Sequence, residues 1–183
     1  MTAIRTLAAA LVLAGTTIAA ETYTIDRDKS EVAFTILNKP PGATEPEKVP
    51  GKFKDFSGKI VFDAEAPANS QVEIEIKSAS VDTANEKRDA HLRNQDFFKV
   101  KEFPIMTFKS TAVKKLAEDK FEVTGDFTLL GQTKPVTAVF DLTDETSGKA
   151  AFQIKRSDYG MSYRVPDTGD EVDVMLTVVG KPQ

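Results

Sequence analysis

The chain of 183 residues contains no cysteine and no tryptophan, and it has a single histidine, His91. Without cysteine the protein forms no disulfide and has no thiolate for nucleophilic chemistry. A single histidine excludes a metal site built from several histidines, and a Ser-His-Asp triad would have to use His91. The stability of the fold must therefore come from side-chain packing and from backbone hydrogen bonds.

Clusters of like charge are also scarce. The chain has 24 Lys and Arg residues against 28 Asp and Glu residues, with a formal net charge of -4, and the two signs are interspersed. Proteins that bind nucleic acid gather their cations on one face. The charge pattern therefore predicts no nucleic-acid partner.

The longest apolar run lies at the N-terminus and is short for a membrane span. Arg5 precedes an apolar stretch over residues 7–18, and small residues follow to Ala20. This order is typical of a secretory signal peptide, whereas a membrane helix needs about 20 apolar residues. We expect residues 1–20 to be a signal peptide cleaved after Ala20. Cleavage one residue earlier and an uncleaved anchor are the alternatives, and a lipoprotein anchor is excluded because cysteine is absent.

Residues 21–183 have the length of one domain, and apolar and polar residues alternate along most of them. The clearest segment is Val72–Lys77, with apolar residues at even positions and charged residues at odd ones. Alternation of this kind is the pattern of a half-buried β-strand. Turn residues separate about eight or nine such segments, so we expect a protein built mainly of antiparallel strands.

Two regions break the alternation. Residues 83–98 are rich in helix formers, and Thr83 with Glu86 three residues later fits a capping box at the start of a helix. Residues 37–51 contain four prolines, which remove backbone donors and disfavour a regular sheet. We expect one short helical segment in the first region and a long exposed loop in the second.

This many strands with one short helix leaves a two-sheet sandwich or a closed barrel. The composition favours the barrel, because closure buries the apolar face of the sheet and removes its exposed edges. A barrel of about eight strands has room inside for side chains or for one slender ligand. Phenylalanine supplies 12 residues against three tyrosines, so the interior would be smooth and apolar. These rings either line a ligand cavity or simply fill the core.

A colinear set of motifs resembles the YceI-like domain family over residues 22–180. The motifs are Tyr23–Asp26, Gly51–Gly58, Ala79–Thr83, Asn85, Arg88–Leu92, Asp96–Phe98, Phe103–Pro104, Phe108–Thr111, Val123–Leu129, Gly131–Val136 and Arg156–Gly160. Each motif is weak alone, but their order is specific. The resemblance implies an extended lipocalin-like barrel in the periplasm, with an elongated pore for a polyisoprenoid or a similar long-chain amphiphile.

The chain departs from the family pattern at two places. Many members have a histidine before the serine where this chain has Lys29 and Ser30, so a role of that histidine does not transfer. The family's short His-Leu-Gly connection is replaced here by Asn38 and the proline-rich segment that ends at Pro50. We expect this segment to reshape the mouth of the pore.

The resemblance and the alternation together give a set of candidate ligand-binding residues. Those expected in the lumen are Phe34, Ile36, Phe62, Ile74, Ile76, Phe108, Phe127, Leu129, Phe140 and Phe152. Those expected at the mouth, beside the ligand's head group, are Asn38, Lys39, Arg88 and Asp158. Asp158 is also expected to order the turn that contains Gly160, a residue suited to conformations that other residues resist.

The function expected from these residues is lipid binding for transport, storage or sequestration, without catalytic residues, a metal or a cofactor other than the bound lipid. A protein that holds a quinone by its isoprenoid tail and an enzyme that acts on a lipid are the alternatives. His91 is expected to be structural, with contact to a ligand head group as the other possibility. The resemblance further implies a homodimer, and transient contact with a membrane or a membrane protein would suit a lipid carrier.

Overall fold

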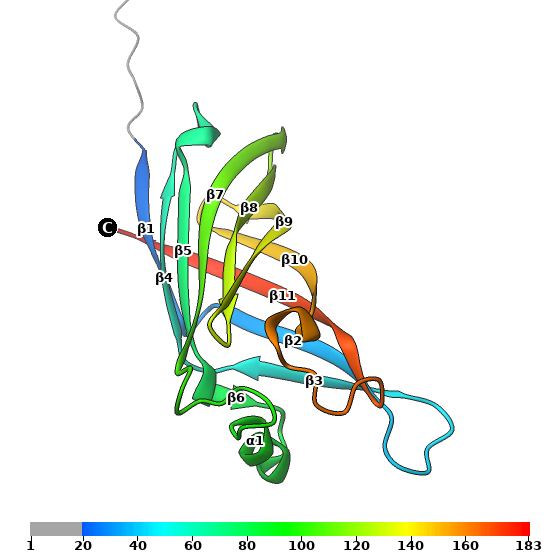
Figure 1. The fold of residues 1–183 in the computed structure, drawn as a ribbon. Helices are drawn as coiled ribbons and strands as arrows, with labels where there is room; N and C mark the ends of the chain where they lie inside the picture. Colours follow the sequence, from blue (N-terminus) through cyan, green and yellow to red (C-terminus); the bar gives the residue numbers. More distant parts are fainter. Residues whose placement is uncertain (1–19) are drawn as a thin grey trace, which may run out of the picture.

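The computed structural model describes residues 20–183 and shows an antiparallel β-barrel with a short helix at one end (Figure 1). The expected signal peptide lies outside the described residues, except for Ala20. The strands are β1 (Glu21–Ile25), β2 (Glu31–Asn38), β3 (Glu47–Phe53), β4 (Phe56–Phe62), β5 (Gln71–Lys77), β6 (Val81–Asp82), β7 (Ile105–Ala117), β8 (Lys120–Leu129), β9 (Gln132–Asp144), β10 (Ser147–Lys155) and β11 (Thr168–Pro182). The helix α1 spans Glu86–Leu92, and 3-10 turns occur at Pro67–Asn69, Ser78–Ser80 and Arg156–Tyr159.

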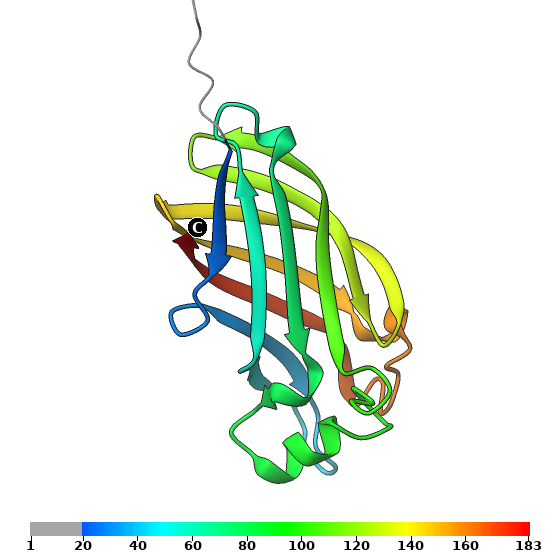
Figure 2. The same ribbon diagram turned by 90° about the vertical axis from the view of Figure 1, so that its left-hand side faces the viewer.

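Eight strands close the barrel in the order β1-β4-β5-β7-β8-β9-β10-β11, and β1 pairs with β11 to complete the ring. Figure 2 shows β1, β4, β5 and β7 side by side on one wall. The strands β2, β3 and β6 extend the sheet from β11 toward α1. Both β1 and β2 pair with β11, β1 at residues 180–182 and β2 at residues 168–177. This topology confirms the all-β class and the eight-stranded barrel expected from the sequence.

The alternating segment that first indicated a strand is β5. Ile74 and Ile76 are each 7% exposed, whereas Glu73 and Glu75 lie on the exposed face. Successive side chains of a strand point to opposite faces, so the even positions face the interior of the barrel. Within residues 20–183 no helix is long and apolar enough to cross a membrane.

The loop predicted over residues 37–51 is shorter than expected and spans residues 39–46. β2 continues to Asn38 and β3 begins at Glu47, and Pro50 stands opposite Thr35 in the register of the two strands. In the described part of the chain, β3 pairs with β6 only at Lys52 and at its neighbour Phe53. The other edge of β3 is therefore free at Pro50, where a missing backbone donor removes no ladder hydrogen bond.

The helix forms where it was expected, but its N-cap differs from the predicted capping box. Asn85 caps α1, because its side-chain oxygen accepts a hydrogen bond from the backbone N–H of Arg88 at 3.0 Å. The backbone N–H and the hydroxyl of Thr83 instead donate to the carboxylate of Asp89. Thr83 thereby ties the segment before the helix to its first turn.

Candidate functional site

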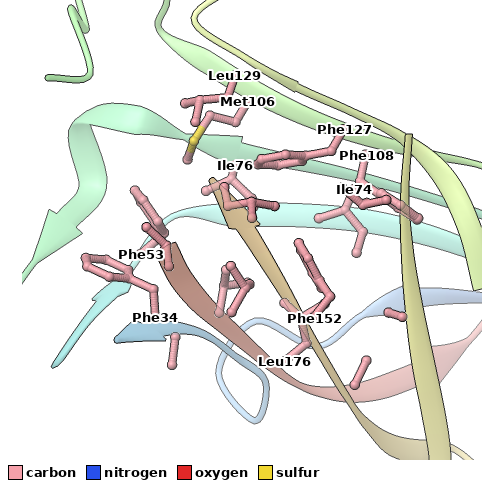
Figure 3. Close-up of a pocket in the computed structure, with 18 of the residues that line it drawn as sticks. Phe34, Phe53, Ile74, Ile76, Met106, Phe108, Phe127, Leu129, Phe152 and Leu176 are labelled. Carbon is pink, nitrogen blue, oxygen red and sulfur yellow. The ribbon is translucent and has the colours of Figure 1, made fainter. Parts of the chain in front are cut away.

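The inward side chains of the barrel surround a cavity of about 410 Å³. This volume lies within the range of ligand pockets, about 300–1,000 Å³. All ten residues expected to face the lumen line the cavity, and Figure 3 shows several of them pointing into one shared space. They are Phe34, Ile36, Phe62, Ile74, Ile76, Phe108, Phe127, Leu129, Phe140 and Phe152. Their contact with a ligand stays a prediction.

Aromatic rings contact one another around the lumen. Phe127 of β8 and Phe152 of β10 meet with centroids 6.3 Å apart, although β9 lies between their strands. Nearer α1, Phe53 packs against Phe34 at 5.6 Å and against Phe98 at 5.5 Å. Tilted and edge-to-face pairs at these separations are favourable arrangements of aromatic rings. The cavity wall is therefore an ordered aromatic surface.

Glycines make room for three of these rings. The three pairs are Phe34 with Gly51, Phe108 with Gly125 and Phe140 with Gly148. A Cβ atom added at Gly51 would lie 2.3 Å from Cζ of Phe34. Because no such atom is present, the phenylalanine ring lies close against the neighbouring strand, and the lumen stays open beside it.

The cavity is long and narrow. Both Thr168, near the start of β11, and Gly180, near its end, line the cavity. Twelve residue steps at about 3.3 Å per residue give a path of about 40 Å between them. A volume of about 410 Å³ spread over this path suits an extended chain far better than a compact ligand.

Polar groups gather at the end of the cavity near α1. Thr168 pairs with Asn38 across the sheet, and its hydroxyl donates to the Asn38 side-chain oxygen at 3.0 Å. Three arginines also line the cavity, and together they define what we call the arginine end: Arg88, Arg156 and Arg164. Two of the four residues expected at the mouth, Asn38 and Arg88, are therefore brought together here.

The other two expected mouth residues lie elsewhere. Lys39 is exposed and is not among the described residues that line the cavity; its backbone N–H donates to the carbonyl of Asp167. Asp158 borders a separate shallow hollow beside Gly160. The carboxylate that binds the turn is Asp170, which accepts hydrogen bonds from the Ser157 backbone and hydroxyl at 2.9 and 2.7 Å. The prediction that Asp158 orders this turn is corrected accordingly, while Gly160 adopts the expected left-handed conformation with φ of 82°.

Arg156 is a buried residue of the cavity wall that was not among the predicted site residues. It is 2% exposed, and burial lowers the pKa of its guanidinium. Its nitrogen atoms donate to four backbone carbonyls, those of Gly169 at 2.7 Å, Met161 at 2.9 Å, Tyr163 at 2.9 Å and Thr168 at 2.8 Å. Phe152 and Ile154 face inward, so continued alternation places Arg156 inside the barrel and could have identified it.

His91 has a structural environment. Its Nε2 atom lies 2.8 Å from Oδ2 of Asp96, and its ring packs edge-on against Phe97 and Tyr163 at 5.1 and 5.6 Å. The contact with Tyr163 joins α1 to the segment that carries Arg164. His91 also lines the cavity, so its ring forms part of the wall at the arginine end. In residues 20–183 no group of three or more histidine, aspartate or glutamate residues is arranged to hold a metal ion.

The opposite end of the cavity has a different polar character. It is lined by Tyr23, Ser70, Glu145 and Thr146. The Tyr23 hydroxyl donates to the carboxylate of Glu21, and this hydrogen bond, together with burial, raises the pKa of Tyr23 to about 12. One acidic residue, Glu145, lines this end, whereas three arginines line the other.

Several known proteins are similar to this chain in sequence or in fold. The model of the YceI-like domain matches residues 23–180. Protein YceI of Escherichia coli is 36% identical over 187 residues, which cover 97% of this chain and 95% of that protein. The fold resembles the crystal structure of BcnA from Burkholderia cenocepacia with a TM-score of 0.75 and 24% identity, covering 86% of this chain and 99% of that one.

A second solved structure shares the fold at lower identity. It is a polyisoprenoid binding domain from Saccharophagus degradans implicated in plant cell wall breakdown, with a TM-score of 0.65 and 16% identity. The match covers 88% of this chain and 98% of that one. Sequence and fold agree over nearly the whole barrel, and the chain belongs to the YceI-like domain family.

Proposed function

We propose that this protein binds a polyisoprenoid or a similar long-chain amphiphile in the barrel lumen, and that it transports, stores or sequesters this ligand in the periplasm. The observation that carries the proposal is the cavity itself, which follows β11 for about 40 Å at 3.3 Å per residue. Its wall is built mainly from Phe, Ile, Leu and Val side chains. A flexible apolar chain fills such a space, whereas a polar metabolite would lose its hydration without gaining partners.

The energetics suit a carrier. Moving a chain from water into the lumen gains about 25 cal/mol for each Å² of apolar surface that is buried. In a membrane the same chain is already dehydrated, so the transfer from membrane to lumen is close to balanced. A carrier needs this balance, because a ligand held too tightly would never be released.

The Saccharophagus degradans domain that shares this fold is a polyisoprenoid binding domain. At 16% identity the likeness extends to the fold alone. The ligand class of this chain therefore rests on its own lining residues. A quinone with an isoprenoid tail would also fit the lumen, and we assign no catalytic residue.

We further propose that the arginine end approaches the membrane when the ligand is exchanged. Three apolar residues are exposed on the segments that carry Asn38 and Arg164: Leu37 at 46%, Tyr163 at 41% and Val165 at 39%. Apolar side chains of this kind insert readily at a lipid surface. Cosedimentation with vesicles tests this contact, and size-exclusion chromatography tests the homodimer that the family resemblance implies.

The binding proposal is tested by uptake. Protein stripped of lipid under folding conditions is titrated with a radiolabelled polyprenol, and bound label is separated from free label on a sizing column. We expect saturation at one chain per barrel. A folded, stripped protein that takes up no polyprenol would contradict the proposal, and cell fractionation of the source bacterium checks the periplasmic location.

A further inference from the structure

We propose that three aromatic side chains, His91, Phe97 and Tyr163, form a gate that opens to admit a ligand into the lumen and to release it. The gate lies where the segment around α1 meets residues 160–167, which join the last 3-10 turn to β11 and which we call the strap. This inference rests on the proposed function and adds to it the route by which the ligand enters and leaves.

A ligand cannot easily pass through the wall of the barrel. The eight strands form a closed ring, and a chain that passed between two of them would break backbone hydrogen bonds of the ladder. At the end near α1 the cavity is instead bordered by two segments outside this ring. One is the helical segment, residues 83–103, and the other is the strap, shown in orange at the same end of the barrel in Figure 1.

Both segments contribute to the cavity wall at this end. His91 and Phe97 of the helical segment line the cavity, and so do Met161 and Arg164 of the strap. The boundary between the two segments is therefore also a boundary between the lumen and the outside. A movement of one segment against the other opens the cavity without any change in the barrel.

Each of the two segments is anchored separately. Arg93 of the helical segment donates to two backbone carbonyls at and just before β6, both at 2.8 Å. Arg156 holds the strap by donating to the carbonyls of Met161 and Tyr163, both at 2.9 Å. The backbone of each segment is therefore fixed near its anchor, and relative movement is concentrated where the side chains of the two segments meet.

Aromatic contacts join the two segments at the gate. The Tyr163 ring packs edge-on against His91 at 5.6 Å and against Phe97 at 5.4 Å, and the rings of His91 and Phe97 lie 5.1 Å apart. Within residues 20–183 no hydrogen bond and no ion pair links the helical segment to the strap. The gate can therefore open without leaving a buried donor or acceptor unpaired, which is the costly event in most local openings.

Tyr163 is the member of the gate that moves. It is 41% exposed, whereas Phe97 is 8% exposed. His91 is held by Asp96, with 2.8 Å between its Nε2 atom and the Oδ2 atom. When the Tyr163 ring turns outward, it uncovers two rings that line the cavity. A tyrosine ring suits this movement, because it is stable both against other rings and at the boundary between water and lipid.

The first experiment measures rates of exchange. Uptake of radiolabelled polyprenol into stripped protein, and its release into excess unlabelled polyprenol, are followed over time. We expect Tyr163→Ala to raise both rates by about tenfold, the size expected from the loss of two aromatic contacts. The equilibrium affinity stays unchanged, because the gate acts on the path and not on the lumen.

Two variants serve as controls for this experiment. Tyr163→Phe keeps the ring and should exchange polyprenol at the wild-type rate. Met175→Ala removes an exposed apolar side chain from the outer face of β11, where Met175 is 46% exposed and lies outside the cavity lining. We expect its rates to equal those of the wild-type protein, so that a faster exchange in Tyr163→Ala reports on the gate.

The second experiment locks the gate. The chain contains no cysteine, so His91→Cys combined with Tyr163→Cys supplies the only two thiols. A bismaleimide with a disulfide in its spacer joins them, and reduction separates them again. We expect the cross-linked protein to exchange polyprenol about tenfold or more slowly than the same protein after reduction. The matched control joins Glu73→Cys to Lys109→Cys, neighbours on the outer face of β5 and β7, and should exchange equally before and after reduction.

The outcomes separate the gate from the proposed function. If the stripped wild-type protein takes up no polyprenol, however long the incubation, the proposed function fails. If uptake reaches the wild-type plateau and the cross-link at the gate changes neither rate, the ligand passes by another route, such as the end near Tyr23, and the gate is wrong. A lower plateau in Tyr163→Ala would also overturn the inference, because the ring would then act on the bound state instead of the path.

Discussion

Phe127 of β8 and Phe152 of β10 contact each other on the wall of the lumen, with ring centroids 6.3 Å apart. The strand between them, β9, carries Ala138, a buried residue that lines the same cavity. Since Val139 pairs with Ala151, the register places Ala138 opposite Phe152. On its other side Ala138 pairs with Val123 of β8. A small side chain therefore leaves space in the lumen beside the Phe152 ring.

Replacing Ala138 with tryptophan tests whether the lumen holds the ligand. The indole ring occupies the space of the chain, so we expect Ala138→Trp to lower polyprenol affinity by about tenfold or more. Uptake of labelled polyprenol measures the effect, and circular dichroism checks the fold. The matched control is Ala151→Trp, which places the same ring on the exposed face of β10. Equal uptake by the two variants would show that the ligand binds elsewhere.

Arg156 is expected to stabilise the segment that follows the 3-10 turn. In Arg156→Met the carbonyls of Gly169, Met161, Tyr163 and Thr168 lose their donor. We expect the free energy of unfolding to fall by about 3 kcal/mol or more, because buried groups left unpaired cost about 1–3 kcal/mol each. Urea denaturation measures the change. The control is Lys155→Met, at the exposed neighbouring residue, whose free energy of unfolding should stay within about 0.5 kcal/mol of wild type. An equally small change in Arg156→Met would contradict the stabilising role of Arg156.

The glycines beneath the phenylalanine rings should differ in their tolerance of alanine. At Gly125 the added Cβ would lie 2.5 Å from the Lys109 carbonyl oxygen, which the sheet holds in place. At Gly51 the nearest atoms all belong to the ring of Phe34, which can turn aside. We expect Gly125→Ala to cost about 1–3 kcal/mol and Gly51→Ala less. Thermal denaturation compares the two variants, and the reverse order would refute the expectation.

The hydrogen bond between Tyr23 and Glu21 predicts a pH dependence at the other end of the cavity. It raises the pKa of Tyr23 to about 12, while an unfolded tyrosine titrates near about 10. The neutral phenol is thus favoured by folding, and its contribution to stability is complete below about pH 10 and lost as the pH rises through about 12. We expect Tyr23→Phe to remove this part of the loss of stability at alkaline pH. Glu21→Gln should lower the phenol pKa, measured by phenolate absorbance, and an unchanged titration would contradict the assignment.

Several features of the molecule could be predicted because they are local. Alternation with a period of two decides which face of a strand is buried, so the lumen positions from Phe34 to Phe152 followed directly from the sequence. The same rule extends to Arg156, two residues beyond Ile154, but a charged residue at an inward position was not expected in an apolar lumen.

Other features depend on contacts between distant parts of the chain. Pro50 fits in β3 only because the neighbouring edge of that strand is free, and which edge is free depends on how the strands pair in the folded sheet. Asp158 and Asp170 are both acidic residues near one turn, and the sequence does not show which of them bonds to Ser157. Lys39 follows Asn38 directly, yet the strand ends between them and only Asn38 faces the cavity.

The central claim, that the lumen holds a long-chain amphiphile, is tested most directly by mass spectrometry of an organic extract from natively purified protein. We predict one long-chain species in a near-stoichiometric amount, and its mass and absorbance distinguish a polyisoprenoid from a quinone. Ala138→Trp purified in parallel should yield much less. A wild-type protein that is empty on purification and that also takes up no added polyprenyl chain would contradict the account.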